Sequence, residues 1–146
     1  MKIAIVTETF VPSVDGVVTR ITATIKWLRK KGHQLLVIAP EQGINEYDGI
    51  PVEGIPSHQL FIYNHRRVAL PHPRVGRLLG EFQPDIVHVV NPALLGMAGI
   101  FYGRKWPLVA SWHTNIPDYA DYYRLPYLKP ALWWMLRWLH NRADIN

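Results

Sequence analysis

Polar side chains follow two apolar runs of the sequence at the points where those runs end. His113, Thr114 and Asn115 come just after the run 108–111, and Asn91 directly follows the run 86–90. Imidazole, amide and hydroxyl groups both donate and accept hydrogen bonds, so they suit a hydroxyl-rich ligand such as a sugar. His113 is therefore a first candidate site residue. The alternative is a histidine that only ties down its own loop.

The turn at Asp15 and Gly16 leads directly into a helical pattern and is suited to holding a phosphate. Backbone N–H groups and the positive end of the helix dipole attract anions at a helix N-terminus. Gly16 would let a ligand approach closely because it carries no side chain. The alternative is an ordinary N-cap and turn. The sequence lacks a GxGxxG fingerprint, which argues against a dinucleotide-dependent dehydrogenase.

A cluster of carboxylates and aromatic rings follows shortly after, at Asp118, Tyr119, Asp121, Tyr122 and Tyr123. Carboxylates accept hydrogen bonds from hydroxyl groups, and aromatic faces offer apolar area to a sugar ring. The cluster is therefore a candidate lining for a polar sugar pocket. The alternative is a solvated helical turn with aromatic packing.

Several kinds of chemistry lack the residues they need. The chain has no cysteine, which excludes disulfides, thiolate metal sites and a cysteine nucleophile. Its seven histidines show no spacing of the HExxH kind, so we predict no bound metal. His88 lies inside an apolar run and is interpreted as a core histidine with its hydrogen bonds satisfied. A serine hydrolase is not indicated, because no GxSxG motif is present.

Two further features favour contact with an anionic surface. Arg66 lies in a cationic segment over residues 65–77, and the chain carries a net charge of +5 with a pI near 9.6. A helix predicted over 130–142 is apolar nearly all round, with Trp134 and Trp138 outside its leucine stripe. For the cationic segment, the alternative is a basic face that is simply solvated. For the helix, the alternative is a spare aromatic patch that meets a partner domain.

Short apolar runs rich in β-branched residues must position these groups. They are continuous rather than alternating, as is typical of parallel strands covered on both faces. Helical patterns separate these runs. The first predicted helix begins at Asp15 or Gly16, and Gly32 follows its end as the C-cap glycine. The alternation predicts an α/β fold, a Rossmann-like doubly wound, mainly parallel sheet flanked by helices, in one domain over residues 1–146. The predicted strands are 3–6, 35–39, 86–90 and 108–111, with helices over 74–82 and 93–102 and irregular or short strand structure over 49–71.

No stretch of the sequence approaches the roughly 20 apolar residues that a membrane-spanning helix needs. The apolar run at the N-terminus is too brief for a signal peptide. We therefore expect a cytoplasmic protein, with peripheral contact with an anionic membrane as a further expectation. Residues 143–146 read as the start of another strand, so we expect the domain to be truncated at its C-terminal end.

These residues together resemble the N-terminal domain of family-4 retaining glycosyltransferases, which have the two-domain GT-B fold. The resemblance spans nearly the whole chain. It is carried by IAIVTETFVPSVDGVVTRI, LRKKGHQLLVIAP, PDIVHVVNP and PLVASWHTNIPDY. The stretch HTNIPDYADYY is most similar to bacterial and plastid lipid glycosyltransferases of the mannosyl- and sulfoquinovosyl-diacylglycerol type.

The resemblance implies a nucleotide-sugar donor held between two domains and a lipid or glycan acceptor on this side, without a metal or other cofactor. The leaving phosphate oxygen would take the acceptor proton, so no protein carboxylate need act as base. The second, donor-binding domain is absent from this chain, so we expect no turnover by it alone. The roles implied are catalysis for His113; donor binding for Asp15, Gly16, Val17 and Thr114; and acceptor binding for Asn91, Asn115, Asp118, Tyr119, Tyr123 and Arg66.

Two alternative functions remain open at this point. In the first, the missing half is a separate polypeptide, so that the C-terminal domain acts in trans and this chain is one subunit of a split transferase. In the second, the chain is a non-catalytic module that binds an anionic membrane or a partner protein through Arg66, Arg67, Trp134 and Trp138. Nucleic-acid binding is not expected, because the basic residues are scattered and no motif for it is present.

Overall fold

The fold is taken from a computed structural model, which describes residues 1–59, 67–122 and 124–146. Of the predicted site residues, Arg66 and Tyr123 lie outside the described residues, and the side chain of Tyr119 is not described either.

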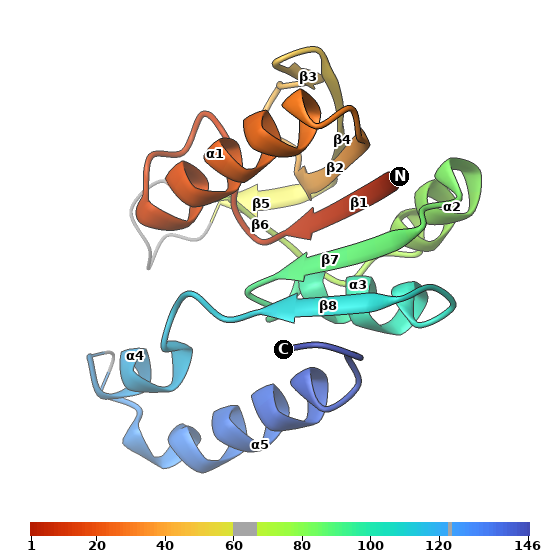
Figure 1. Cartoon of the computed structure of the whole chain (residues 1–146). Coiled ribbons are helices and arrows are strands. Elements are labelled where there is room, and N and C mark those ends of the chain that lie inside the picture. The colour runs from red at the N-terminus through yellow and green to blue at the C-terminus, as the bar shows by residue number, and fades with distance from the viewer. Residues whose placement is uncertain (60–66, 123) are drawn as a thin grey trace.

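A six-stranded, mainly parallel sheet forms the centre of the molecule (Figure 1). The four predicted strands are confirmed and lie side by side. In the described part of 49–71 the predicted short strand structure is also found, and the strand after Gly49 pairs in parallel with the sheet as its fifth parallel strand. A short antiparallel strand closes one edge, and a separate two-stranded ribbon lies beside the sheet. The strands are β1 Lys2–Thr7, β2 Gln34–Pro40, β3 Glu46–Tyr47, β4 Ile50–Ile55, β5 Ser57–Gln59, β6 Arg67–Ala69, β7 Ile86–Val90 and β8 Leu108–Ser111.

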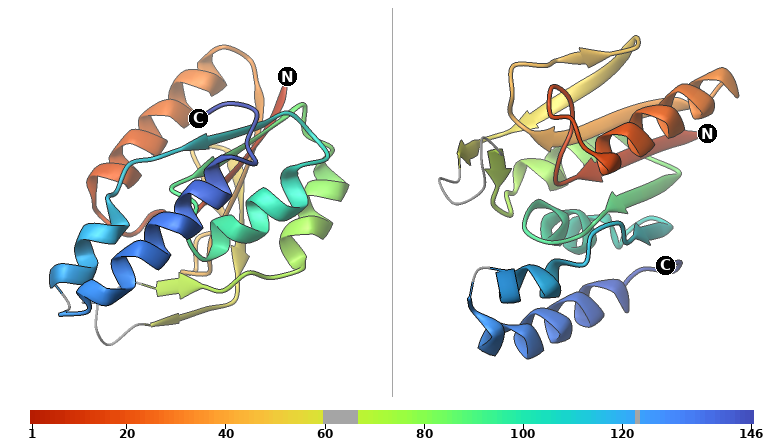
Figure 2. Two further views of the ribbon diagram at one scale, coloured as in Figure 1. Left: turned by 90° about the horizontal axis from the view of Figure 1, so that it is seen from below. Right: turned by 90° about the vertical axis from the view of Figure 1, so that its left-hand side faces the viewer.

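Helices cover both faces of the sheet, as the doubly wound prediction requires. The view from below in Figure 2 shows α1 on one side of the strands and α2 and α3 on the other. Successive side chains of β1 serve the two faces: Ile3 and Ile5 pack with α1, whereas Ala4 and Val6 pack with α2, α3 and α5. The helices are α1 Gly16–Lys30, α2 Arg74–Phe82, α3 Leu95–Gly103, α4 Ile116–Tyr122 and α5 Lys129–His140, with a 3₁₀ turn η1 over Pro126–Leu128.

Helix α1 begins and ends where the sequence predicts. The Asp15 carboxylate accepts a hydrogen bond from the N–H of Val18, which makes Asp15 the N-cap. At the other end Gly32 adopts φ 81°, and the N–H of His33 donates to the carbonyl of Leu28. The left-handed glycine and this hydrogen bond together form a Schellman motif at the C-terminal end of α1.

Two other predicted helices differ from the structure at their ends. Helix α3 begins at Leu95 rather than Ala93, and the N–H of Ala93 donates to the Glu8 side chain just before the helix starts. Helix α5 ends at His140, two residues earlier than predicted. The end of the chain then turns back, and Ile145 pairs in parallel with Val109 of β8, as expected for the start of another strand.

The order of the strands creates a switch point between β1 and β7. From β1 the chain winds outward through β2 to β4 and then returns to the other side of β1 with β7 and β8. Ligands of open α/β sheets bind where the loops diverge at such a point, beyond the carboxyl ends of the strands. The loops after β1, β7 and β8, which carry the predicted site residues, all lie at this edge. Among the described residues, no helix is long and apolar enough to cross a bilayer.

Candidate functional site

Asn91 joins the loops that follow β7 and β8. It adopts φ 56°, and its N–H donates to the Ser111 carbonyl at 2.7 Å. Its side-chain oxygen accepts hydrogen bonds from the N–H groups of His113 and Thr114, at 3.4 and 3.2 Å. The asparagine therefore fixes the position of the segment that carries the candidate catalytic histidine.

The hydroxyl group of Ser111 links two histidines. Its oxygen lies 2.8 Å from Nε2 of His88 and 3.0 Å from Nε2 of His113. The hydroxyl has one proton, so it donates to one imidazole while the other imidazole donates to it. His88, interpreted from the sequence as a core histidine with its hydrogen bonds satisfied, is only half-buried, and its Nε2 has Ser111 as a partner. The sequence did not reveal that His88 is joined to His113.

A cation on α1 lies close to this pair. Burial lowers the pKa of His88 to about 4, helped by the charges of His113 and Arg20, and the pKa of His113 is lowered by burial and by Arg20. Both imidazoles are therefore neutral at neutral pH, and Arg20 carries the charge. Together with apolar residues and Thr24, the three side chains line a cavity of about 20 Å³, room for about one water molecule.

Arg20 was not predicted to be a site residue, although its spacing from Gly16 was a usable signal. It lies four residues after Gly16, so the two residues share one side of α1. The helix therefore directs a guanidinium and its own N-terminal end toward the same edge of the sheet.

Gly16 is not required by the fold. Its φ lies outside the left-handed region, and a Cβ atom added there would meet nothing within 4 Å. In the described part of the chain the N–H groups of Gly16 and Val17 donate to no protein atom, whereas Asp15 caps Val18. An open glycine beside two free donors leaves space for a ligand to approach the backbone closely.

Glu8 is a second residue that the sequence did not single out. Its carboxylate accepts hydrogen bonds from the N–H groups of Ala93, Leu95 and Gly96, at 2.9, 3.2 and 2.7 Å. Burial raises the pKa of Glu8, and these backbone donors oppose the rise. The carboxylate thus ties the loop after β1 to the start of α3 across the switch point. Its place directly after an apolar strand was the available signal.

Two of the predicted acceptor residues lie further out, at the start of α4. The amide of Asn115 donates to the Asp118 carboxylate. Lys129 forms ion pairs with Asp118 at 3.4 Å and with Asp121 at 2.6 Å, and both carboxylates are more than half exposed. This group is an exposed charge cluster joining α4 to α5, as in the alternative of a solvated helical turn.

The aromatic residues of α5 divide into two sets. Trp112 of the β8 loop packs against Trp133, with ring centroids 5.4 Å apart, and so anchors that loop on α5. Trp134 and Trp138 face outward, 67% and 41% exposed, and the Arg142 guanidinium lies 3.4 Å from the Trp138 ring centroid. The two tryptophans predicted to lie outside the leucine stripe are therefore exposed, with a cation beside one of them.

The chain belongs to glycosyltransferase family 4, whose family model matches residues 14–146. It is 36% identical over 99% of its length to a GDP-mannose-dependent alpha-mannosyltransferase of Mycolicibacterium smegmatis, covering 40% of that protein. It is 30% identical over 91% of its length to the sulfoquinovosyl transferase SQD2 of Arabidopsis thaliana, covering 27% of it. Against the alpha-monoglucosyldiacylglycerol synthase of Streptococcus pneumoniae the identity is 31% over 84% of the chain and 29% of that protein. The chain thus spans about 40% or less of the length of these relatives.

Proposed function

We propose that this chain is the acceptor-side half of a glycosyltransferase that moves a hexose from a nucleotide-sugar to a lipid or sugar acceptor with retention. The relatives named above transfer mannose, sulfoquinovose or glucose, and two of the names specify an alpha product. A nucleotide-sugar and a lipid or glycan are accordingly its expected partners.

The observation that carries the proposal is the convergence of anion-binding and sugar-binding groups at one edge of the sheet. The N–H groups of Gly16 and Val17 and the guanidinium of Arg20 suit the donor diphosphate. The neutral imidazole of His113 is suited to hydrogen-bonding a hydroxyl of the transferred sugar. Side-chain oxygens of Asp15 and Asn91 already accept hydrogen bonds from protein N–H groups. In this proposal these two residues therefore position the binding groups.

The remaining predicted residues keep lesser roles in this proposal. Thr114 would border the donor from the β8 loop, held there by Asn91. Asn115 and Asp118 would meet the acceptor only at its outer end, because they are paired with each other.

Turnover in this proposal needs a second domain. The groups described here face the donor from one side, whereas stabilising a leaving diphosphate requires preorganised donors around it. We therefore expect the chain alone to bind donor or acceptor weakly without transferring sugar. Mixing it with a candidate second half and assaying transfer would test whether the other domain acts in cis or in trans.

The direct test is a titration of the ¹⁵N-labelled chain with GDP-mannose and with UDP-glucose, followed by amide chemical shifts. We expect shifts at Gly16, Val17 and around His113 for the preferred donor. Gly16→Ala adds one methyl group at the proposed phosphate contact and should weaken binding about tenfold, equivalent to about 1.4 kcal/mol. Gly80→Ala is the matched control, since Gly80 is also helical with open space around it. Shifts confined to other regions, or equal effects of the two variants, would contradict the proposal.

A peripheral membrane contact is proposed as a second property, favoured by the patch formed by Trp134 and Trp138 of α5 and by Arg142, which follows the helix. Indole rings and cations suit the interface of an anionic bilayer. Cosedimentation with phosphatidylglycerol vesicles should fall when Trp134 and Trp138 are both replaced by alanine. Trp27→Ala, an exposed tryptophan on α1, should have no effect. Equal binding by all three proteins would contradict this assignment.

A further inference from the structure

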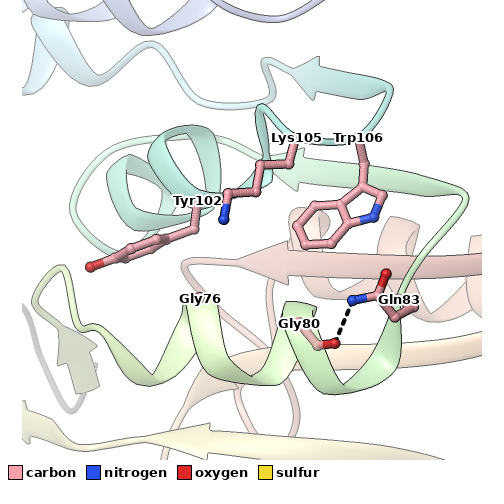
Figure 3. Close-up of a pocket in the computed structure, with 6 residues that line it drawn as sticks. All are labelled: Gly76, Gly80, Gln83, Tyr102, Lys105 and Trp106. Carbon is pink, nitrogen blue, oxygen red and sulfur yellow. Dashed lines mark hydrogen bonds between the residues drawn. The ribbon is translucent and has the colours of Figure 1, made fainter.

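A second cavity lies between α2 and α3, away from the edge that carries the proposed transfer site. It has a volume of about 340 Å³ and is lined by Gly76, Gly80, Gln83, Tyr102, Lys105 and Trp106 (Figure 3). Gln83 comes just before β7, and Lys105 and Trp106 come just before β8. Because His113 and Asn91 come after the same strands, these lining residues belong to the opposite, amino-terminal edge of the sheet.

Small residues on one side of α2 open this cavity. Gly76 and Gly80 are four residues apart and so share one face of the helix, and Gln83 caps its C-terminal end with φ 50°. Gly76 is needed for packing, because a Cβ atom there would lie 2.6 Å from the Tyr102 ring. Gly80 is different: a Cβ atom there would meet nothing within 4 Å. No packing contact accounts for the glycine at position 80, and the cavity is the space beside it.

The lining combines flat rings with hydrogen-bonding groups and one cation. Figure 3 shows the Lys105 amine between the rings of Tyr102 and Trp106, and the Trp106 indole nitrogen on the side of Gln83. The Gln83 amide donates to the Gly80 carbonyl at 2.6 Å, which leaves its own oxygen as an acceptor. No ion pair to Lys105 is present in residues 1–59, 67–122 and 124–146, and no carboxylate lines the cavity.

We propose that this cavity is a binding site for an anionic monosaccharide such as a hexose phosphate. Aromatic faces pack against the C–H face of a sugar ring, the indole N–H and the amide oxygen bond its hydroxyl groups, and Lys105 binds its phosphate. The volume decides the size of the ligand, because it lies at the low end of the range of about 300–1,000 Å³ for small-molecule sites. One sugar ring with a phosphate fits this volume. The site is separate from the proposed donor site and does not depend on it.

Glucose 6-phosphate is the probe for the test, with glucose and inorganic phosphate as matched partial ligands. The ¹⁵N-labelled chain is titrated with each, and the Trp106 indole N–H signal is assigned by its loss in Trp106→Phe. We expect glucose 6-phosphate to shift this signal and the amides of 104–106, with each partial ligand binding at least about tenfold more weakly. Signals of Gly16 and His113 should stay in place.

Two pairs of variants separate the ligand site from the fold. Lys105→Gln should weaken binding about tenfold, whereas Arg104→Gln removes the neighbouring cation and should leave binding unchanged. Gly80→Leu should fill the cavity and abolish binding, whereas Glu81→Leu places the same apolar side chain on an exposed neighbour that does not line the cavity and should leave binding unchanged. The proposal is overturned if glucose 6-phosphate shifts no signal at about 10 mM, or if Lys105→Gln and Gly80→Leu bind it normally. It is also overturned if phosphate alone binds as well, which would indicate a simple anion site.

Discussion

The two edges of the sheet are built by different physical means. At the carboxyl edge, side-chain oxygens of Glu8, Asn91 and Ser111 join three loops through hydrogen bonds, several of them partly buried. At the amino edge, Gly76 makes room for the Tyr102 ring, and Gly80 leaves open the space of the cavity between α2 and α3. The first region is therefore sensitive to removing polar atoms, and the second is sensitive to adding carbon atoms.

Glu8→Ala should be the most destabilising change at the carboxyl edge. It leaves three N–H groups at the start of α3 without their acceptor, and we expect a loss of about 3 to 4 kcal/mol in the free energy of unfolding. Urea denaturation measures this, and amide hydrogen exchange should be faster at Leu95 and Gly96. Glu46→Ala, at an exposed residue of β3, is the control and should change stability by less than about 0.5 kcal/mol. A loss of similar size in both variants would remove Glu8 from its assigned role.

The partners of Glu8 could not be predicted from the sequence, unlike most of the fold. The strands, α1 with its caps and the shared edge of the loops followed from periodicity and turn residues, because these depend on neighbours along the chain. The bond from Glu8 to Gly96 joins residues 88 positions apart. Local sequence patterns do not indicate a partner so far along the chain. From the sequence, Glu8 could therefore be described only as a polar residue that follows a strand.

The same limit explains the site residues that were missed. Arg20 and His88 act through their nearness to His113, which depends on the pairing of β1 with β7 and of β7 with β8. The sequence predicted a parallel sheet without fixing the order of its strands. Asp118 was open to two interpretations because its partner, Lys129, lies beyond the next turn of the chain.

His88 should make the carboxyl edge sensitive to acid. Its pKa is lowered to about 4 from the ordinary value of 6.5, so between these values the unfolded chain binds a proton that the folded chain does not. The free energy of unfolding therefore falls as the pH falls through this window, by up to about 3 kcal/mol. His88→Gln keeps a polar partner for Ser111 and should remove most of this pH dependence, measured by urea denaturation at several pH values. His58→Gln, at an exposed histidine, should keep the full dependence. A wild-type stability that is flat between pH 6.5 and 4 would contradict the prediction.

The smallest effects are expected at the amino edge, where two alanine substitutions on one helix should act in opposite directions. Gly76→Ala forces a Cβ atom to 2.6 Å from the Tyr102 ring, so the ring must move, at a cost of about 1 to 2 kcal/mol. Gly80→Ala meets no atom and gains helix propensity, so it should raise the free energy of unfolding by about 0.5 to 1 kcal/mol. Thermal unfolding of the two variants and the wild type would compare them. If both substitutions destabilise, Gly80 has a packing role after all, and the cavity beside it is not the reason for the glycine.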